Sequence, residues 1–203
     1  MAEITAITPQ KKDKSRCNIE IDGKFYCGMK LDTVLANGLK VGMSVEPAAL
    51  SQLQLESEKL TALDKALKHI SVSMKTEKEI RRFLSTKGYL EDVTNYVLEK
   101  MKDYGFVDDG AYAASYVEGA SKRKGSRLIE LELKQKGVDA ESIEEALSSI
   151  EDETESAKRC LAKYMRGKPL DEVTLKKAYR NLLSRGFDYD TCRQAIESLK
   201  DED

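Results

Sequence analysis

The densest group of cations in the sequence lies at residues 121–127, which read SKRKGSR. Lys122, Arg123, Lys124 and Arg127 supply four positive charges within six residues. Cations at this density can hold phosphate groups or an acidic protein surface. A solvated loop is the alternative, because runs of charge usually lie in water. The segment is therefore a candidate partner-binding site, with both alternatives open.

A carboxylate pair, Asp108–Asp109, is a second candidate for chemistry. Two adjacent carboxylates can bind a metal ion, but they can also accept hydrogen bonds from the free N–H groups at a helix start. The residues that follow predict a helix, so we favour capping by Asp108 or Asp109 over a metal site.

The residues that usually carry catalysis are sparse. His69 is the single histidine and lies within a predicted helix, where it has no second histidine or nearby cysteine to form a metal site or a triad. Cys17, Cys27, Cys160 and Cys192 show no CxxC spacing and are predicted to be free, small core residues. Phosphate-loop, dinucleotide, nucleophile-elbow and zinc-protease motifs are all missing from the sequence. We expect no catalytic residue, no metal and no cofactor, and hence no enzyme.

The overall charge limits the classes of partner. The 203 residues contain 34 Lys and Arg against 36 Asp and Glu, a net charge of −2. Such a balance argues against a uniformly basic coat for nucleic acid and favours a protein partner or a local basic stripe. The sequence has no signal segment and no apolar run long enough to span a bilayer. We expect a cytoplasmic monomer that does not enter a membrane.

The first 30 residues alternate apolar and polar side chains, which predicts strands. A hairpin is expected to turn at residues 22–24. A three-residue connection places Phe25, Cys27 and Met29 opposite the apolar residues of the preceding strand, on one face. A lone hairpin is only marginally stable, so a third strand near residues 4–8 and a helix near residues 32–37 are expected to cover it.

The rest of the sequence contains an internal repeat. Gly88, Gly137 and Gly186 are spaced by 49 residues, and Leu84, Leu133 and Leu182 precede them by four. A basic residue stands before each glycine and an apolar residue after it, a pattern typical of a helix that closes at a left-handed glycine. Further apolar pairs, four residues apart, predict one more helix upstream in each repeat: Leu63 and Leu67, Tyr112 and Tyr116, Leu161 and Met165.

Each repeat is thus predicted to contain three helices, at about residues 59–105, 107–150 and 153–199. The predicted fold is mainly α, with three tandem three-helix repeats in an elongated curved array after a small N-terminal β-hairpin or sheet subdomain. The expected division is an N-terminal β-rich extension at 1–47 and helical repeats at 48–106, 107–150 and 151–203. Residues 76–79 have capping-box spacing at the start of a second helix.

Further cations lie on the second helix of each repeat. Repeats placed side by side can align these into a stripe, which makes them weaker candidates for partner contacts: Arg81, Arg82, Lys87, Lys136 and Arg185. Tyr112 and Tyr116 lie on one helix face and could stack on bases, although packing in the core is the favoured use.

The order of these motifs resembles the RecX family. Residues 105–109 read GFVDD and are followed by Tyr112–Ala113 and Tyr116–Val117, similar to the signature of that family. Ile129, Glu132, Leu133 and Lys136–Gly137–Val138 resemble its second repeat, and Leu182 with Arg185–Gly186–Phe187 resembles its third. The N-terminal residues are similar to the β extension of Gram-positive members. The resemblance covers nearly the whole chain.

This resemblance implies a non-enzymatic regulator that binds the RecA–single-stranded-DNA filament and inhibits its recombinase and co-protease activities, and so modulates DNA repair, homologous recombination and the SOS response. Glu118–Gly119–Ala120 stands where family members carry an arginine-bearing run, so contact with RecA is implied more strongly than contact with DNA, which is expected to be weak. Three-helix units also resemble helix-turn-helix folds. The alternative is therefore a stand-alone DNA-binding helical module that acts without RecA.

Overall fold

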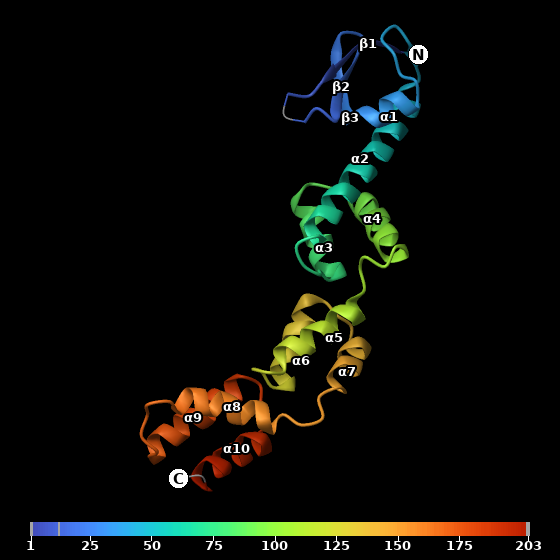
Figure 1. Ribbon diagram of the computed structural model, residues 1–203. Helices are drawn as coiled ribbons and strands as arrows, with labels where there is room; N and C mark the ends of the chain where they lie inside the picture. Colours follow the sequence, from blue (N-terminus) through green and yellow to red (C-terminus); the bar gives the residue numbers. More distant parts are fainter. Residues whose placement is uncertain (1, 12, 202–203) are drawn as a thin grey trace. The chain divides into compact units, whose positions relative to one another are not determined.

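The computed structural model describes residues 2–11 and 13–201 (Figure 1). Contacts divide the chain into two compact units, Met1–Ser73 with Ile80–Phe106 and Met74–Glu79 with Val107–Asp203. Described residues form four strands and ten helices: β1 (Ala2–Pro9), β2 (Arg16–Ile21), β3 (Lys24–Lys30), α1 (Leu31–Ala36), β4 (Ser44–Val45), α2 (Pro47–Ile70), α3 (Glu77–Thr86), α4 (Glu91–Asp103), α5 (Asp109–Ala120), α6 (Ser126–Lys136), α7 (Ala140–Leu147), α8 (Thr154–Met165), α9 (Glu172–Ser184) and α10 (Tyr189–Asp201).

The first unit begins with an antiparallel sheet in the order β3-β2-β1-β4. Its buried face collects the apolar residues of the alternating pattern, and α1 and the start of α2 complete the core. The predicted third strand and covering helix are therefore confirmed. The buried members of this core are Ile4, Cys17, Ile19, Ile21, Cys27, Met29, Val34, Leu39, Val45 and Leu50.

The hairpin turn differs from the prediction. Cys17 pairs with Met29 and Ile19 with Cys27, as expected, but Phe25 pairs with Glu20 and is 65% exposed. The connection is a two-residue Asp22–Gly23 turn, with φ of +49° and +77°. Positive φ at both positions is the type I′ geometry that matches strand twist. The register shifts between Ile19 and Glu20, so a bulge restores the apolar face and the longer turn is not needed.

Helix α2 connects the sheet to the first helical repeat within the first unit. Leu50, near its start, packs into the core of the sheet, and polar contacts follow: the Arg16 guanidinium donates to Thr61 Oγ1 at 2.7 Å, and the Lys30 N–H donates to Ser57 Oγ at 2.6 Å. Farther along, Ala62 and Ala66 are buried, and α2 contacts α4. Its single histidine, at position 69, stacks on the Phe83 ring with centroids 4.1 Å apart, which is a packing role.

The second unit contains two further three-helix bundles, α5–α7 and α8–α10, each with its own core. The repeat prediction is confirmed at the level of hydrogen bonds. In all three repeats the residue after the glycine donates its N–H to the repeat leucine, from Tyr89 to Leu84, Val138 to Leu133 and Phe187 to Leu182. Gly88, Gly137 and Gly186 have φ of +84°, +89° and +88°, the left-handed closure expected of them.

In the first helix of the first repeat, the buried positions differ from the predicted ones. Ala62 and Ala66 are fully buried there, whereas the predicted face of Leu63 and Leu67 is only half-buried.

Candidate functional site

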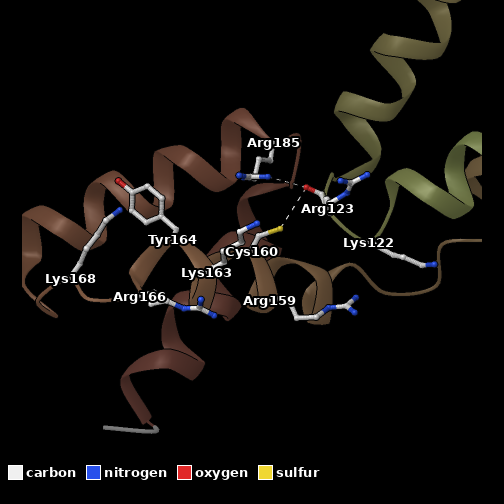
Figure 2. Close-up of a pocket in the computed structure, with 9 residues that line it drawn as sticks. All are labelled: Lys122, Arg123, Arg159, Cys160, Lys163, Tyr164, Arg166, Lys168 and Arg185. Carbon is white, nitrogen blue, oxygen red and sulfur yellow. Dashed lines mark hydrogen bonds between the residues drawn. The ribbon is translucent and has the colours of Figure 1, made fainter.

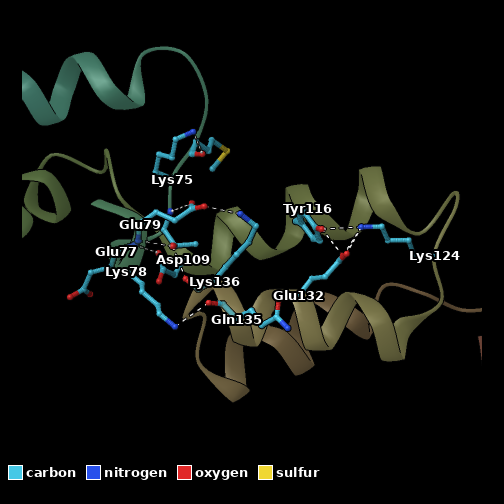
Figure 3. A network of polar contacts seen from close by, with 12 residues as sticks. Lys75, Glu77, Lys78, Glu79, Asp109, Tyr116, Lys124, Glu132, Gln135 and Lys136 are labelled. Atoms are coloured by element: carbon cyan, nitrogen blue, oxygen red, sulfur yellow. Dashed lines mark hydrogen bonds and ion pairs between the residues drawn. The ribbon is translucent and has the colours of Figure 1, made fainter. Parts of the chain in front are cut away.

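The first turn of α3 rests on α5 and α6, within the second unit (Figure 3). The Glu77 N–H donates to Asp109 Oδ1 at 2.9 Å, and the Thr76 hydroxyl donates to the backbone carbonyl of Lys136 at 2.7 Å. Thr76 and Glu79 also form the predicted capping box, with bonds of 3.1 and 3.2 Å. Asp108 caps α5 through the Ala111 N–H at 2.8 Å. The two adjacent aspartates therefore serve two different helices.

Lys136 forms a partly buried ion pair. Its ammonium lies 2.8 Å from Glu79 Oε1 and 5.4 Å from the centroid of the Tyr112 ring. Burial acts against the charged forms, yet the hydrogen bond between the two groups lowers the pKa of Glu79 and raises that of Lys136. The charge of this lysine is therefore compensated inside the protein.

Lys124 is held in a similar way. Its ammonium lies 2.6 Å from Glu132 and 3.3 Å from the Tyr116 hydroxyl, which itself donates to Glu132 Oε2 at 2.6 Å (Figure 3). Burial opposes ionisation of the carboxyl, but the hydrogen bonds from Lys124 and Tyr116 lower the pKa of Glu132. Tyr112 and Tyr116 pack against the bundle core, as favoured above. Of the predicted 121–127 cluster, Lys124 is thus already paired.

The same packing recurs 49 residues later. The Gly125 N–H donates to the backbone carbonyl of Arg185 at 2.9 Å, at the positions that correspond to Thr76 and Lys136. The Ser126 N–H donates to Glu153 Oε1 at 2.6 Å. A Cβ on Gly186 would lie 2.4 Å from the Leu128 N and Cβ, so only glycine fits this approach. The second and third bundles therefore meet through close backbone contact.

Beside this contact lies a hollow of about 520 Å³, which we call the basic hollow (Figure 2). It is lined by seven cations, Cys160 and Tyr164. The thiol of Cys160 and the guanidinium of Arg185 both point to the backbone carbonyl of Arg123, at 3.6 and 3.5 Å. The cations are Lys122, Arg123, Arg159, Lys163, Arg166, Lys168 and Arg185.

These charges are not neutralised from within. Among the residues that the structure describes, none of the seven forms an ion pair with a carboxylate. Arg159 donates to Ser156 and to a backbone carbonyl, and Lys168 lies 3.2 Å from the centroid of the Tyr164 ring. The hollow is therefore a local concentration of positive charge in a protein of net charge −2.

The structure brings some of the predicted cations together and separates others. Lys122, Arg123 and Arg185 line the basic hollow, whereas the Arg127 guanidinium lies over the Tyr189 ring at 5.5 Å. The α3 candidates belong to the first unit. There Arg81 bonds Asn95, Arg82 is exposed, and Lys87 lies 5.6 Å from the Phe83 ring.

Sequence reasoning missed the cations of α8 and its C-terminal end. Their spacing, RCLAKYMRGK at residues 159–168, was a usable signal, because positions 159, 163 and 166 lie on one helical face. Cys160 also differs from the prediction: Cys17, Cys27 and Cys192 are buried, but Cys160 is half-buried at the hollow. Burial raises the pKa of the Cys27 and Cys192 thiols to about 11.

Within residues 2–11 and 13–201, no group of three or more His, Cys, Asp or Glu is placed to hold a metal ion. In the same range, no helix is both long and apolar enough to cross a membrane.

These features define a protein with a small N-terminal β domain followed along the chain by three-helix bundles. Comparison with known proteins identifies the family. The regulatory protein RecX N-terminal domain matches residues 2–46, and the first, second and third RecX three-helix domains match residues 62–101, 108–147 and 151–196. The chain belongs to the RecX family.

Individual relatives agree with this assignment. The chain is 36% identical over 203 residues to the regulatory protein RecX of Clostridium botulinum (strain Eklund 17B / Type B), covering 97% of this chain and 96% of that one. It is 31% identical to the Bacillus subtilis (strain 168) protein of the same name, covering 100% and 79%. A crystal structure of regulatory protein RecX superposes with a TM-score of 0.70 at 27% identity, covering 98% of this chain and 100% of that one. The crystal structure of RecX from Lactobacillus salivarius superposes with a TM-score of 0.63 at 27% identity, covering 70% of this chain and 97% of that one.

Proposed function

We propose that this protein binds the RecA–single-stranded-DNA filament and lowers its recombinase and co-protease activities, without catalysing a reaction itself. The observation that carries the proposal is the match of RecX domains to all four parts of the chain. The relatives are named regulatory proteins, in agreement with a role in control rather than chemistry. In this proposal the protein acts in the cytoplasm, as a monomer, in DNA repair and recombination.

Tandem bundles suit a polymeric partner. Several weak contacts on one chain reinforce one another when the partner repeats regularly, because each bound bundle raises the effective concentration of the next. We propose Lys122, Arg123 and Arg185 as contacts with the filament, because the basic hollow leaves their charges available. Arg127, Arg81, Arg82 and Lys87 are weaker candidates. Lys124 and Lys136 are instead proposed to stabilise the second unit through their ion pairs.

The test is a RecA strand-exchange assay, with a DNA-dependent ATPase assay in parallel, each with and without the protein. Inhibition of both at protein concentrations below that of RecA supports the proposal. Undiminished strand exchange and ATPase activity at equimolar protein would exclude it.

The basic hollow also favours a second candidate, a DNA-binding helical module that acts without RecA. That function predicts tight binding of duplex DNA in a gel shift with a steep salt dependence. Binding of duplex without any effect on RecA would favour this candidate over the first.

The division of the chain at 1–47, 48–106, 107–150 and 151–203 is likewise a proposal, which limited proteolysis at these boundaries tests.

A further inference from the structure

We propose that the basic hollow binds the sugar-phosphate backbone of single-stranded nucleic acid. The proposal starts from the uncompensated charge of the site. Seven cations from three separate segments, the α5–α6 loop, α8 with its C-terminal end, and the end of α9, converge on one hollow. Like charges this close repel one another and weaken the folded state, unless an anionic ligand neutralises them.

The contrast with the rest of the second unit strengthens this argument. Outside the hollow, cations of the unit are repeatedly paired with carboxylates one helical turn away or on the adjacent helix. These described pairs are Lys124–Glu132, Lys134–Glu130, Lys136–Glu79, Lys158–Glu155, Lys176–Glu172 and Arg193–Asp190. Among the described residues, six cations elsewhere in this unit thus have a carboxylate partner, whereas none of the seven at the hollow has one.

The chemistry of the lining favours phosphates over an acidic protein surface. The centre of a protein interface is depleted in charged residues and enriched in apolar and aromatic side chains. Here only Cys160 and Tyr164 are uncharged, and Lys168 lies against the Tyr164 ring. Arginine forks match phosphate oxygens in pairs, and lysines add point charges along a strand. An open hollow lined by both arginines and lysines can bind a flexible phosphate chain without recognising its base sequence.

The inference rests on the proposed function for its choice of partner, because a protein that acts on a RecA–single-stranded-DNA filament meets that strand. Its test uses the full-length protein and bare DNA, so that RecA has no part in the result. Binding of a fluorescent oligothymidylate is followed by anisotropy between about 50 and 200 mM salt.

The decisive variant is Lys122→Gln with Lys163→Gln. Both side chains are exposed, and neither forms a hydrogen bond or an ion pair within the described part of the chain, so the fold is expected to be intact. The matched control is Lys176→Gln with Lys177→Gln, which removes the same charge from an exposed face of α9 in the same unit. We expect the hollow variant to bind roughly 10-fold more weakly, with the log–log salt slope reduced by about 1.4, and the control to match the wild type within about twofold. Equal losses in both variants would overturn the proposal.

Cys160 supplies a second readout at the site itself. It is the half-buried thiol of the four, so alkylation by iodoacetamide is expected there, and Cys160→Ser identifies the labelled position. Saturating oligothymidylate is expected to slow this alkylation severalfold, because the strand covers the thiol. Unchanged alkylation at saturation would place the DNA elsewhere and overturn the proposal.

Two further arms separate the possible outcomes. Inorganic tripolyphosphate shares the phosphate chemistry without a polymer backbone, so competition only at concentrations far above that of the oligonucleotide supports a strand as the ligand. Competition at equal phosphate concentration contradicts it. RecA inhibition without oligonucleotide binding would overturn this inference alone, whereas oligonucleotide binding without RecA inhibition would overturn the proposed function alone.

Discussion

Asp109, the first residue of α5, accepts a hydrogen bond from the backbone N–H of Glu77, the first residue of α3, at 2.9 Å. The adjacent Asp108 caps α5 itself. One acidic dipeptide therefore satisfies free N–H groups at the starts of two helices that are far apart in sequence. The contact lies within the second unit, next to the ion pair of Glu79 with Lys136.

Replacement of Asp109 by alanine tests this arrangement. Loss of a carboxylate cap typically costs about 1 kcal/mol of helix stability. We expect Asp109→Ala to speed amide hydrogen exchange in the first turn of α3 by roughly fivefold, measured by mass spectrometry. Asp190→Ala removes an exposed carboxylate that pairs with Arg193, and should leave exchange in α3 unchanged. Equal exchange in both variants would show that the Asp109 contact does not hold the helix.

The repeat glycines provide a matched pair of substitutions. A Cβ on Gly88 meets nothing within 4 Å, so Gly88→Ala is expected to cost only the left-handed strain, about 1 kcal/mol in the first unit. Gly186→Ala must also displace the Leu128 backbone, for a total of about 3 kcal/mol in the second. Hydrogen exchange resolves the two units separately. Similar losses at both positions would argue against the close approach of the bundles.

Part of the pH dependence of stability follows from Glu79 and Glu132, whose pKa values are lowered from 4.5, against the effect of burial, by hydrogen bonds from Lys136 and Lys124. A carboxyl with a lowered folded pKa contributes stability that is complete above its unfolded pKa and is lost as pH falls through the folded value. We expect the free energy of unfolding of the second unit to fall between about pH 5 and pH 3. The double variant Glu79→Gln and Glu132→Gln should show a shallower fall. Glu144→Gln with Glu145→Gln, on the exposed face of α7, should keep the wild-type slope.

Two lysines of the 121–127 segment are expected to behave differently. Lys124→Gln breaks the partly buried pair with Glu132 and should lower the free energy of unfolding by about 1 kcal/mol. Lys122→Gln removes an exposed charge and should change stability by less than about 0.5 kcal/mol, while it weakens partner binding. Urea denaturation and a RecA ATPase assay on the same two proteins separate these effects. Loss of inhibition in Lys124→Gln at full stability would contradict the structural role.

The secondary structure of this protein was readable from sequence because its signals are local. Alternation over residues 17–29 predicted the strands, and the 49-residue glycine period predicted three helical repeats. The hairpin register was missed because a two-residue turn with a bulge places Cys27 and Met29 on the apolar face as a longer turn does, and differs only in leaving Phe25 exposed. Hydrophobic pattern alone does not distinguish the two.

The sequence alone determined that the chain forms repeated three-helix bundles and resembles RecX, since helix caps, glycine closures and apolar periods act over a few residues. Only the tertiary structure decided which cations are available for a partner. Lys122 and Lys124 are two residues apart, yet one faces the basic hollow and the other pairs with Glu132. Whether a surface charge is neutralised depends on side chains brought near it by packing, and Glu132 and Arg159 take their places only when the bundles form and meet.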